Sequence, residues 1–216
     1  MTVLTPEILL TAYTHGIFPM AESQDDPELF WVDPERRGIF PLDDFHLSRS
    51  MRKFIRSNPF HVTVDTCFRK VMKACAEPAK DRENTWINRP ILDLYTELHL
   101  QGNAHSVEVW RDDKMVGGLY GVSFGAVFCG ESMFSRESNT SKLALAYLVA
   151  RLNAGGFKLL DTQFLTDHLA SMGAIEISRE EYHRRLDQAV NLEADFYSLE
   201  GDASPDDIIQ SITQTS

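Results

Sequence analysis

Alternating apolar and polar positions dominate the second half of the chain, and helical repeats lie between them. Short alternating runs bounded by turn residues predict strands, and longer runs with apolar residues every three or four positions predict helices. The resulting order of strands and helices favours an α/β (α+β) fold with a mixed sheet. The strands are expected at 105–111, 114–122, 126–134, 157–163 and 174–178, and the helices at 140–153, 165–172 and from 179 onward.

The first half of the chain shows a less regular pattern. Thr5 and Pro6 are the start signals of a short helix, with Thr5 as N-cap, and Gly16 ends it. Residues 21–45 are rich in Asp and Pro and are expected to be irregular. Further helices are expected at 46–57, 66–75 and 89–102, and a strand at 60–64.

The length of the chain, 216 residues, allows one domain with a large core or two smaller ones. We expect a small N-terminal domain over residues 1–60 and a larger domain built on the mixed sheet over residues 61–192. Residues 193–216 form an acidic tail that is expected to be partly disordered.

Composition and cysteine spacing limit the class of protein. Hydrophobic residues make up 43% of the chain and charged residues 25%, which is typical of a globular protein. No run of about 18 apolar residues occurs, and the first twenty residues lack the order of a signal peptide. Cys67, Cys75 and Cys129 lack metal-binding spacing, which indicates free thiols in a reducing compartment. We therefore expect a cytoplasmic protein with no membrane segment and no structural zinc.

The net charge of −11 is unevenly distributed. The segment from residue 186 to the end holds seven acidic residues and no Lys or Arg, whereas residues 46–57 are locally basic. On a helix, the spacing of Arg49, Arg52, Lys53 and Arg56 places all four on one face. Such a face is either simply solvated or follows the phosphates of a nucleic acid, and the pattern alone leaves both possibilities open.

Three polar residues interrupt otherwise apolar runs. Glu131 lies in FCGESMFS (128–135), and Asp161 and Gln163 lie in GGFKLLDTQF (155–164). A buried carboxylate needs a partner or carries a shifted pKa, because burying a lone charge is costly. Two acids and an amide in an apolar cavity would form a candidate catalytic site.

The strand and helix order is that of acyltransferases that use acetyl-coenzyme A, so we expect an acetyltransferase-like domain. Such enzymes bind the pyrophosphate at a glycine-rich turn between a strand and a helix. The corresponding turn here, residues 134–142, contains no glycine. We therefore expect an acyl donor other than coenzyme A.

Several long motifs resemble those of the leucyl/phenylalanyl-tRNA–protein transferase family. They are AYTHGIFPM (12–20), TWI (85–87), AHSVEVWR (104–111), VGGLYGV (116–122), FCGESMFSRESNTSK (128–142) and LLDTQFLTDHLASMGA (159–174). The resemblance implies a cytoplasmic enzyme with no metal or cofactor. Such an enzyme moves Leu or Phe, and Met less well, from aminoacyl-tRNA to proteins that begin with Arg or Lys, and so marks them for degradation. It also implies an acetyltransferase-like C-terminal domain and a smaller N-terminal domain.

The resemblance also assigns site residues. Asp161 and Gln163 match catalytic positions, with Glu131 in support. Asp161 would accept or orient the proton of the acceptor amine, Gln163 would donate to the ester carbonyl or hold the amine, and Glu131 would fix this network or read the cationic N-terminal side chain.

Binding residues follow from the same resemblance. The side chain of the transferred amino acid would occupy a pocket, and the basic face would contact the tRNA backbone. The pocket positions are Phe128, Met133, Leu145, Leu119 and Leu160, the further substrate-binding positions are Tyr13, Tyr95 and Trp86, and the tRNA-binding positions are Arg49, Arg52, Lys53 and Arg56. The chain departs from the family at Met20, where an aromatic residue is usual, and at Thr166, where Asn is usual.

Two other functions remain compatible with the pattern. The first is an acetyltransferase-fold enzyme that builds peptidoglycan cross-bridges from aminoacyl-tRNA, and the choice of acceptor separates it from the family above. The second is a tRNA-binding protein without turnover. Nucleophile-elbow, dinucleotide-binding and di-metal patterns are absent from the sequence.

Overall fold

The computed structural model describes residues 4–24, 26, 28–57, 59–78, 85–200 and 203–213. Its strands are β1 (Phe18–Met20), β2 (Phe30–Val32), β3 (Arg36–Phe40), β4 (His61–Val64), β5 (Ala104–Arg111), β6 (Lys114–Phe124), β7 (Val127–Ser135), β8 (Leu159–Gln163) and β9 (Ile175–Ser178). Its helices are α1 (Pro6–Thr14), α2 (Arg49–Ser57), α3 (Phe68–Ala76), α4 (Arg89–Leu100), α5 (Thr140–Ala154), α6 (Asp167–Ala170), α7 (Arg179–Ala189) and α8 (Pro205–Thr213), with a 3-10 turn, η1, at Leu42–Asp44.

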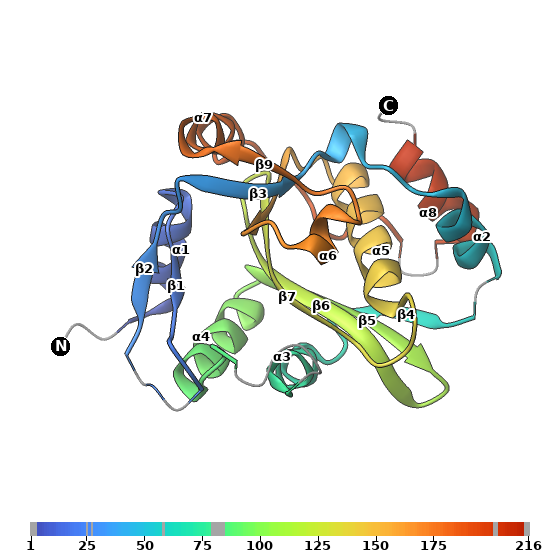
Figure 1. Cartoon of the computed structure of the whole chain (residues 1–216), viewed down its shortest axis with the longest axis horizontal. Coiled ribbons are helices and arrows are strands. Elements are labelled where there is room, and N and C mark those ends of the chain that lie inside the picture. The colour runs from blue at the N-terminus through green and yellow to red at the C-terminus, as the bar shows by residue number, and fades with distance from the viewer. Residues whose placement is uncertain are drawn as a thin grey trace.

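A mixed seven-stranded sheet forms the centre of the protein (Figure 1). Its strand order is β4-β5-β6-β7-β8-β3-β9, and β7 and β8 are its parallel pair, joined by α5. The other neighbours pair antiparallel, and β1 and β2 form a separate hairpin. This arrangement confirms the predicted α+β class, and β5, β6 and β7 form an antiparallel meander.

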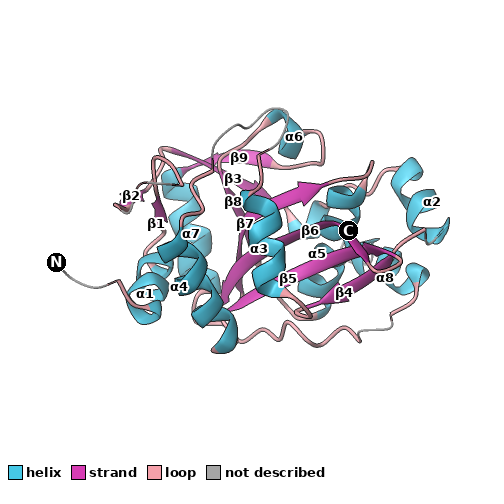
Figure 2. Cartoon of the chain, turned by 90° about the horizontal axis from the view of Figure 1, so that it is seen from below, coloured by secondary structure: helices cyan, strands magenta, loops and turns pink. Residues whose placement is uncertain are grey.

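Helices cover both faces of the sheet, as Figures 1 and 2 show. On one face, α5 packs with α2 and α8 in a core that includes Leu148 and Ile212. On the other face, α1, α3, α4 and α7 enclose a second core that includes Tyr95 and Tyr182. The sheet therefore separates two apolar layers, and residues at its centre contact little water.

Local signals place most elements where the sequence predicts them. The Thr5 side chain accepts a hydrogen bond from the Ile8 N–H, and Pro6 is the first residue of α1. Asn88 caps α4 in the same way through the Ile91 N–H. The three cysteines are free, as expected. Agreement at these ends reflects signals that act over three or four residues.

The expectation for residues 21–45 is wrong, because this segment contains β2, β3 and η1. The strand β3 lies in the central sheet, between β8 and β9. Its sequence, RRGIF, shows no alternation, and two distant strands supply its hydrogen bonds. Pairing that depends on residues far away in the chain leaves no local signal.

The acidic tail is more ordered than the sequence indicates. Within it, α8 buries Ile208, Ile209 and Ile212 against α5 and α2. Residues 201–202 and 214–216 of this tail lie outside the described residues. The domain division at residue 60 stays a prediction. None of the described helices has the length and apolar character needed to cross a membrane.

Candidate active site

The candidate site lies where two parallel strands separate. The β7–β8 ladder runs from Val127–Leu159 to Cys129–Asp161, although β7 continues to Ser135. Beyond the last pair the strands diverge, and a cavity of about 290 Å³ opens beside them. We call it the main cavity. Its described lining consists of Phe40, Leu119, Tyr120, Gly130, Glu131, Ser132, Met133, Leu145, Leu148, Leu160, Thr162, Gln163, Thr166, His168 and Leu169.

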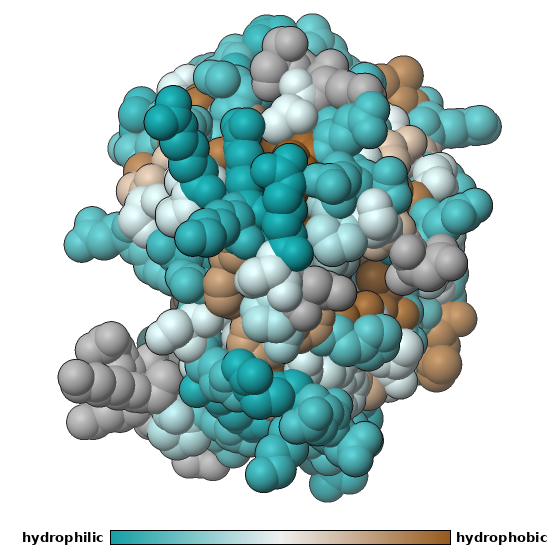
Figure 3. Space-filling model, turned by 90° about the vertical axis from the view of Figure 1, so that its right-hand side faces the viewer, coloured by the Kyte–Doolittle hydropathy of each residue, from teal (hydrophilic) through white to brown (hydrophobic). Residues whose placement is uncertain are grey.

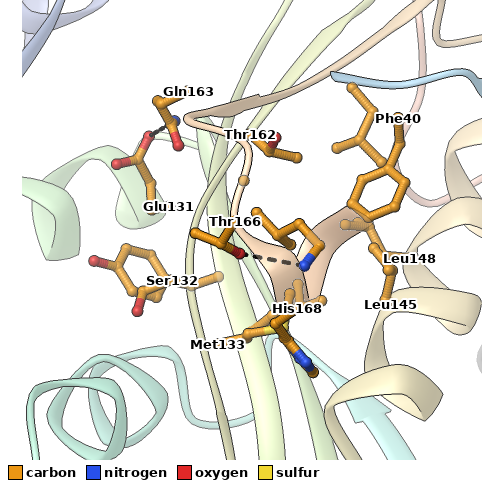
Figure 4. Close-up of a pocket in the computed structure, with 15 residues that line it drawn as sticks. Phe40, Glu131, Ser132, Met133, Leu145, Leu148, Thr162, Gln163, Thr166 and His168 are labelled. Carbon is orange, nitrogen blue, oxygen red and sulfur yellow. Dashed lines mark hydrogen bonds between the residues drawn. The ribbon is translucent and has the colours of Figure 1, made fainter. Parts of the chain in front are cut away.

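Two polar side chains form one wall of the main cavity. Gln163 donates a hydrogen bond from Nε2 to Oε1 of Glu131 over 3.2 Å. Figure 4 shows this pair on one side, with Phe40, Leu145 and Leu148 on the other. The arrangement combines an apolar space with a carboxyl and an amide, as is typical of a small-molecule binding site.

Two tyrosines bind Glu131 from behind. The Tyr13 hydroxyl donates to Glu131 Oε1 over 2.6 Å and lies 2.5 Å from the Tyr95 hydroxyl, which is 3.4 Å from Glu131 Oε2. Burial raises the pKa of the Glu131 carboxyl to about 8, although the hydrogen bonds from both tyrosines act to lower it. The carboxyl therefore titrates near neutral pH.

Asp161 lies deeper and forms an ion pair with Arg37. The Arg37 Nε and Nη2 atoms donate to the two carboxylate oxygens over 2.8 and 2.6 Å, and the side chains of Arg37 and Asp161 are 1% and 0% exposed. The Tyr182 hydroxyl also donates to Asp161, over 3.2 Å. Burial opposes the Arg37 charge, but the Asp161 carboxylate raises the pKa of Arg37 above its usual value.

The expected role of Asp161 as the acceptor of the amine proton stays a prediction. Both of its oxygens are used within the protein, and it does not line the main cavity. Instead, Asp161 Oδ1 accepts a hydrogen bond from the Gln163 N–H over 2.9 Å. Asp161 therefore contacts the backbone of Gln163, which lines the main cavity.

The backbone at Gln163 adopts the left-handed region, with a φ of 59°. This conformation is unusual for a residue other than glycine and is held here by the Asp161 hydrogen bond. On the neighbouring strand, a Cβ atom at Gly38 would lie 2.7 Å from Thr162 Oγ1 and 2.9 Å from the Phe164 carbonyl carbon. A glycine at position 38 is thus needed for β3 to approach this turn.

Most of the predicted pocket residues line the main cavity. Leu119, Met133, Leu145 and Leu160 line it. Phe128 does not, because its ring is fully buried and packs against Phe157 and Phe196 in the core. Pocket and core positions are both apolar, so the sequence pattern could not separate them.

The other predicted substrate-binding residues lie outside this lining. Tyr13 and Tyr95 are buried and contact Glu131, as described above. Trp86 is half-buried and packs against the core that α3 and α4 enclose. Tyr13 and Tyr95 therefore contact Glu131 rather than the cavity surface.

The predicted basic face is present on α2. Met51 and Ile55 are buried, whereas Arg49, Lys53 and Arg56 are exposed. The fourth residue, Arg52, is half-buried and donates from Nε to the Leu47 carbonyl. Arg56 forms an ion pair with Asp206 of α8 over 2.8 Å. One of the four cations is therefore already paired with a carboxylate of the acidic tail.

The site residues that sequence reasoning missed include two that hold Asp161 and one that lines the main cavity. Arg37 and Tyr182 hold Asp161, and His168 lines the main cavity from α6. A buried Asp161 implies a cationic partner, but the chain has 21 Lys and Arg residues and no local signal selects one. Among the described residues, no group of three or more His, Cys, Asp or Glu side chains could hold a metal ion.

Family models cover most of the chain and name one family. Family models match residues 3–35, as the N-terminal domain of leucyl/phenylalanyl-tRNA protein transferase, and residues 39–187, as leucyl/phenylalanyl-tRNA protein transferase. A solved structure of L-PGS from Bacillus licheniformis aligns over 76% of this chain and 55% of its own at 13% identity, and its TM-score of 0.39 is too low to show a shared fold.

Two relatives with the same name align with this chain over nearly their whole length. The leucyl/phenylalanyl-tRNA--protein transferase of Rhodospirillum rubrum is 57% identical over 196 residues, which cover 91% of this chain and 92% of the relative. That of a Ruegeria species is 57% identical over 213 residues, 99% of each chain. The chain therefore belongs to the leucyl/phenylalanyl-tRNA–protein transferase family and is a transferase enzyme.

Proposed function

We propose that this enzyme transfers leucine or phenylalanine, and methionine less well, from aminoacyl-tRNA to the N-terminal Arg or Lys of acceptor proteins. The addition marks these proteins for degradation, in the cytoplasm. The observation that carries the proposal is the main cavity, in which Glu131 and Gln163 face an apolar wall.

The apolar part of the main cavity suits the transferred side chain. Leu119, Met133, Leu145 and Leu160 offer no polar partner, so a polar amino acid would lose its hydrogen bonds with water. One methylene group more or less changes binding by only about 1–3 kcal/mol in an apolar pocket. This weak discrimination fits a site that takes Leu, Phe and Met.

The reaction needs one proton transfer and no covalent intermediate on the enzyme. The acceptor nitrogen bonds to the ester carbonyl carbon, and the bond from that carbon to the ribose oxygen breaks. The nitrogen loses a proton and the ribose oxygen gains one. Because the ester is already activated, positioning of the two substrates supplies much of the rate.

We assign the proton transfer to Glu131. Its carboxyl lines the main cavity and has a pKa of about 8, close to the pKa of about 7.7–8.0 of a peptide α-amine. Matched pKa values let a carboxylate accept a proton from the nitrogen and return it to the ribose oxygen. Glu131 is the catalytic residue of this proposal.

Gln163 and Asp161 position the amine. Because Gln163 donates from Nε2 to Glu131, its Oε1 can accept an N–H of the acceptor amine. Asp161 fixes the backbone of Gln163, and Arg37 fixes Asp161. The exposed cations of α2, Arg49 and Lys53, would contact the phosphates of the tRNA.

The direct test combines the purified protein with radiolabelled Leu-tRNA and peptides that begin with Arg, Lys, Asp or Ala. Label should move to the Arg and Lys peptides only. Transfer to a cell-wall precursor instead would support the peptidoglycan alternative. Label that stays on bound tRNA with every acceptor would overturn the proposed activity.

A further inference from the structure

A second cavity, of about 270 Å³, lies beside the main cavity. We call it the flanking cavity. Leu145 lines both cavities, and Phe40 of the main cavity packs against Phe45 of the flanking cavity with ring centroids 5.6 Å apart. The α6 helix continues the shared wall, with Leu169 on one side and Ala170 on the other. The two cavities are therefore neighbours.

The flanking cavity has an apolar interior and a basic edge. Phe45, Leu47, Met51 and Met172 are nearly buried and form its interior. Lys142 and His46 also line it, and among its described lining no residue is acidic. Lys142 has no carboxylate partner within the part of the chain that the structure describes. Such a cavity favours an apolar group that carries a negative charge.

The flanking cavity also connects the main cavity to the basic helix. Ser48, which lines it, accepts a hydrogen bond from the Met51 N–H at the start of α2. The exposed Arg49 and Lys53 follow on the same helix. Hydrophilic side chains cover most of the face that α2 and α8 form (Figure 3). A polyanion bound along α2 would thus reach the flanking cavity before the main cavity.

We propose that the flanking cavity binds a nucleotide of the donor's single-stranded 3′ end, on the 5′ side of the aminoacylated adenosine. The base lies in the apolar interior, and Lys142 contacts the phosphate. This inference rests on the proposed function. The esterified adenosine must stay at the mouth of the main cavity, so the preceding nucleotide is the one that reaches its neighbour.

The charge of the flanking cavity argues against the acceptor as its occupant. An acceptor that begins with Arg or Lys carries two positive charges near its end, and Lys142 would repel it. Apolar side chains that contact bases without reading their edges are typical of proteins that bind single strands. The flanking cavity therefore extends the donor site and leaves the acceptor to approach from elsewhere.

The test compares donors of increasing length on Lys142→Ala, Lys142→Arg and a control, Lys73→Ala, whose exposed side chain lies on α3 across the sheet. The donors are leucyl-adenosine, the leucylated trinucleotide CCA and full-length Leu-tRNA. Removing one phosphate contact on a single strand should raise KM about fivefold at 0.1 M salt, because the salt slope per phosphate is about 0.7.

The proposal expects Lys142→Ala to raise KM for the trinucleotide and for tRNA, but not for leucyl-adenosine. Lys142→Arg should restore both values, and the control should match the unmodified enzyme. An equal effect on all three donors, no effect on any donor, or an effect on the acceptor's KM would overturn the inference. If the unmodified enzyme transfers from none of the donors, the proposed function itself fails, which is a separate result.

Discussion

Arg37 and Asp161 form a bidentate ion pair beneath the main cavity, with neither side chain more than 1% exposed. The pair joins β3 to β8, which are 124 residues apart in the chain at these positions. Arg37 also donates to the Gly16 carbonyl over 2.9 Å and stacks against the rings of Phe18 and Tyr182. Four separate segments therefore meet at one guanidinium group.

Removing the Arg37 charge should destabilise the protein strongly. Arg37→Met leaves the Asp161 carboxylate buried without a cation, which costs about 3–5 kcal/mol in the free energy of unfolding. The neighbouring pair Arg36–Glu176 is largely exposed and is the matched control. Arg36→Met should change the same free energy by about 0–1 kcal/mol. Chemical denaturation of both variants measures this difference. Equal losses of unfolding free energy in the two variants would contradict the claim that burial makes the Arg37–Asp161 pair more important than the exposed pair.

The location of β3 explains why the sequence predicted only part of this site. Glu131, Asp161 and Gln163 interrupt apolar runs, and a polar residue in a buried strand is visible without a structure. Arg37 lies beside another arginine in a segment rich in Asp and Pro, so it resembles an exposed loop residue. Its burial results from pairing with β8 and β9, which no local pattern records.

The roles of the predicted residues were harder to derive than their positions. Asp161 and Glu131 are both acids within apolar runs, and the sequence does not reveal which one faces the cavity. The structure separates them because only the Asp161 carboxylate meets a guanidinium. Phe128 shows the same limit, since a core phenylalanine and a pocket phenylalanine have the same local pattern.

Glu131 should make the protein less stable as the pH rises. Its pKa is about 8 in the folded state and 4.5 when unperturbed, so between these values the folded state holds a proton that the unfolded state has lost. The free energy of unfolding should therefore fall from pH 5 to pH 8. Glu131→Gln removes this contribution, and its curve should be flatter by more than about 1 kcal/mol, since one pKa unit corresponds to about 1.4 kcal/mol.

Urea denaturation at several pH values checks this prediction, with Glu137→Gln as control. Glu137 is a partly exposed glutamate that accepts hydrogen bonds from Arg111, and these hydrogen bonds lower its pKa. The contribution of Glu137 to the free energy of unfolding therefore increases, rather than decreases, as the pH rises. Parallel curves for the unmodified protein and Glu131→Gln would show that Glu131 is ionised in the folded state at neutral pH.

Tyr13 should set the pH dependence of transfer. Its hydroxyl donates to Glu131 over 2.6 Å and favours the ionised carboxylate. Tyr13→Phe should move the rise in transfer rate upward by about one pH unit, because a hydrogen bond to a charged group contributes about 1.5–3 kcal/mol and Tyr95 remains. The measurement is the single-turnover rate against pH with one acceptor peptide throughout.

Tyr182→Phe is the control for that experiment. The Tyr182 hydroxyl donates to Asp161 rather than to Glu131, so its loss should leave the midpoint of the profile in place. Because the acceptor amine titrates in the same range, only the difference between variants is informative. A shared shift in both variants would remove Glu131 from the proton transfer.

The acidic tail should weaken tRNA binding through Asp206. This carboxylate pairs with Arg56 over 2.8 Å, next to the exposed cations of α2. Asp206→Asn frees Arg56 for a phosphate, so the Kd for tRNA should fall by several-fold and the salt slope should steepen by about one unit. Asp187→Asn, an exposed position on α7, removes the same charge at a different site and should have little effect. Equal gains in both variants would show that net charge, rather than release of Arg56, controls the affinity.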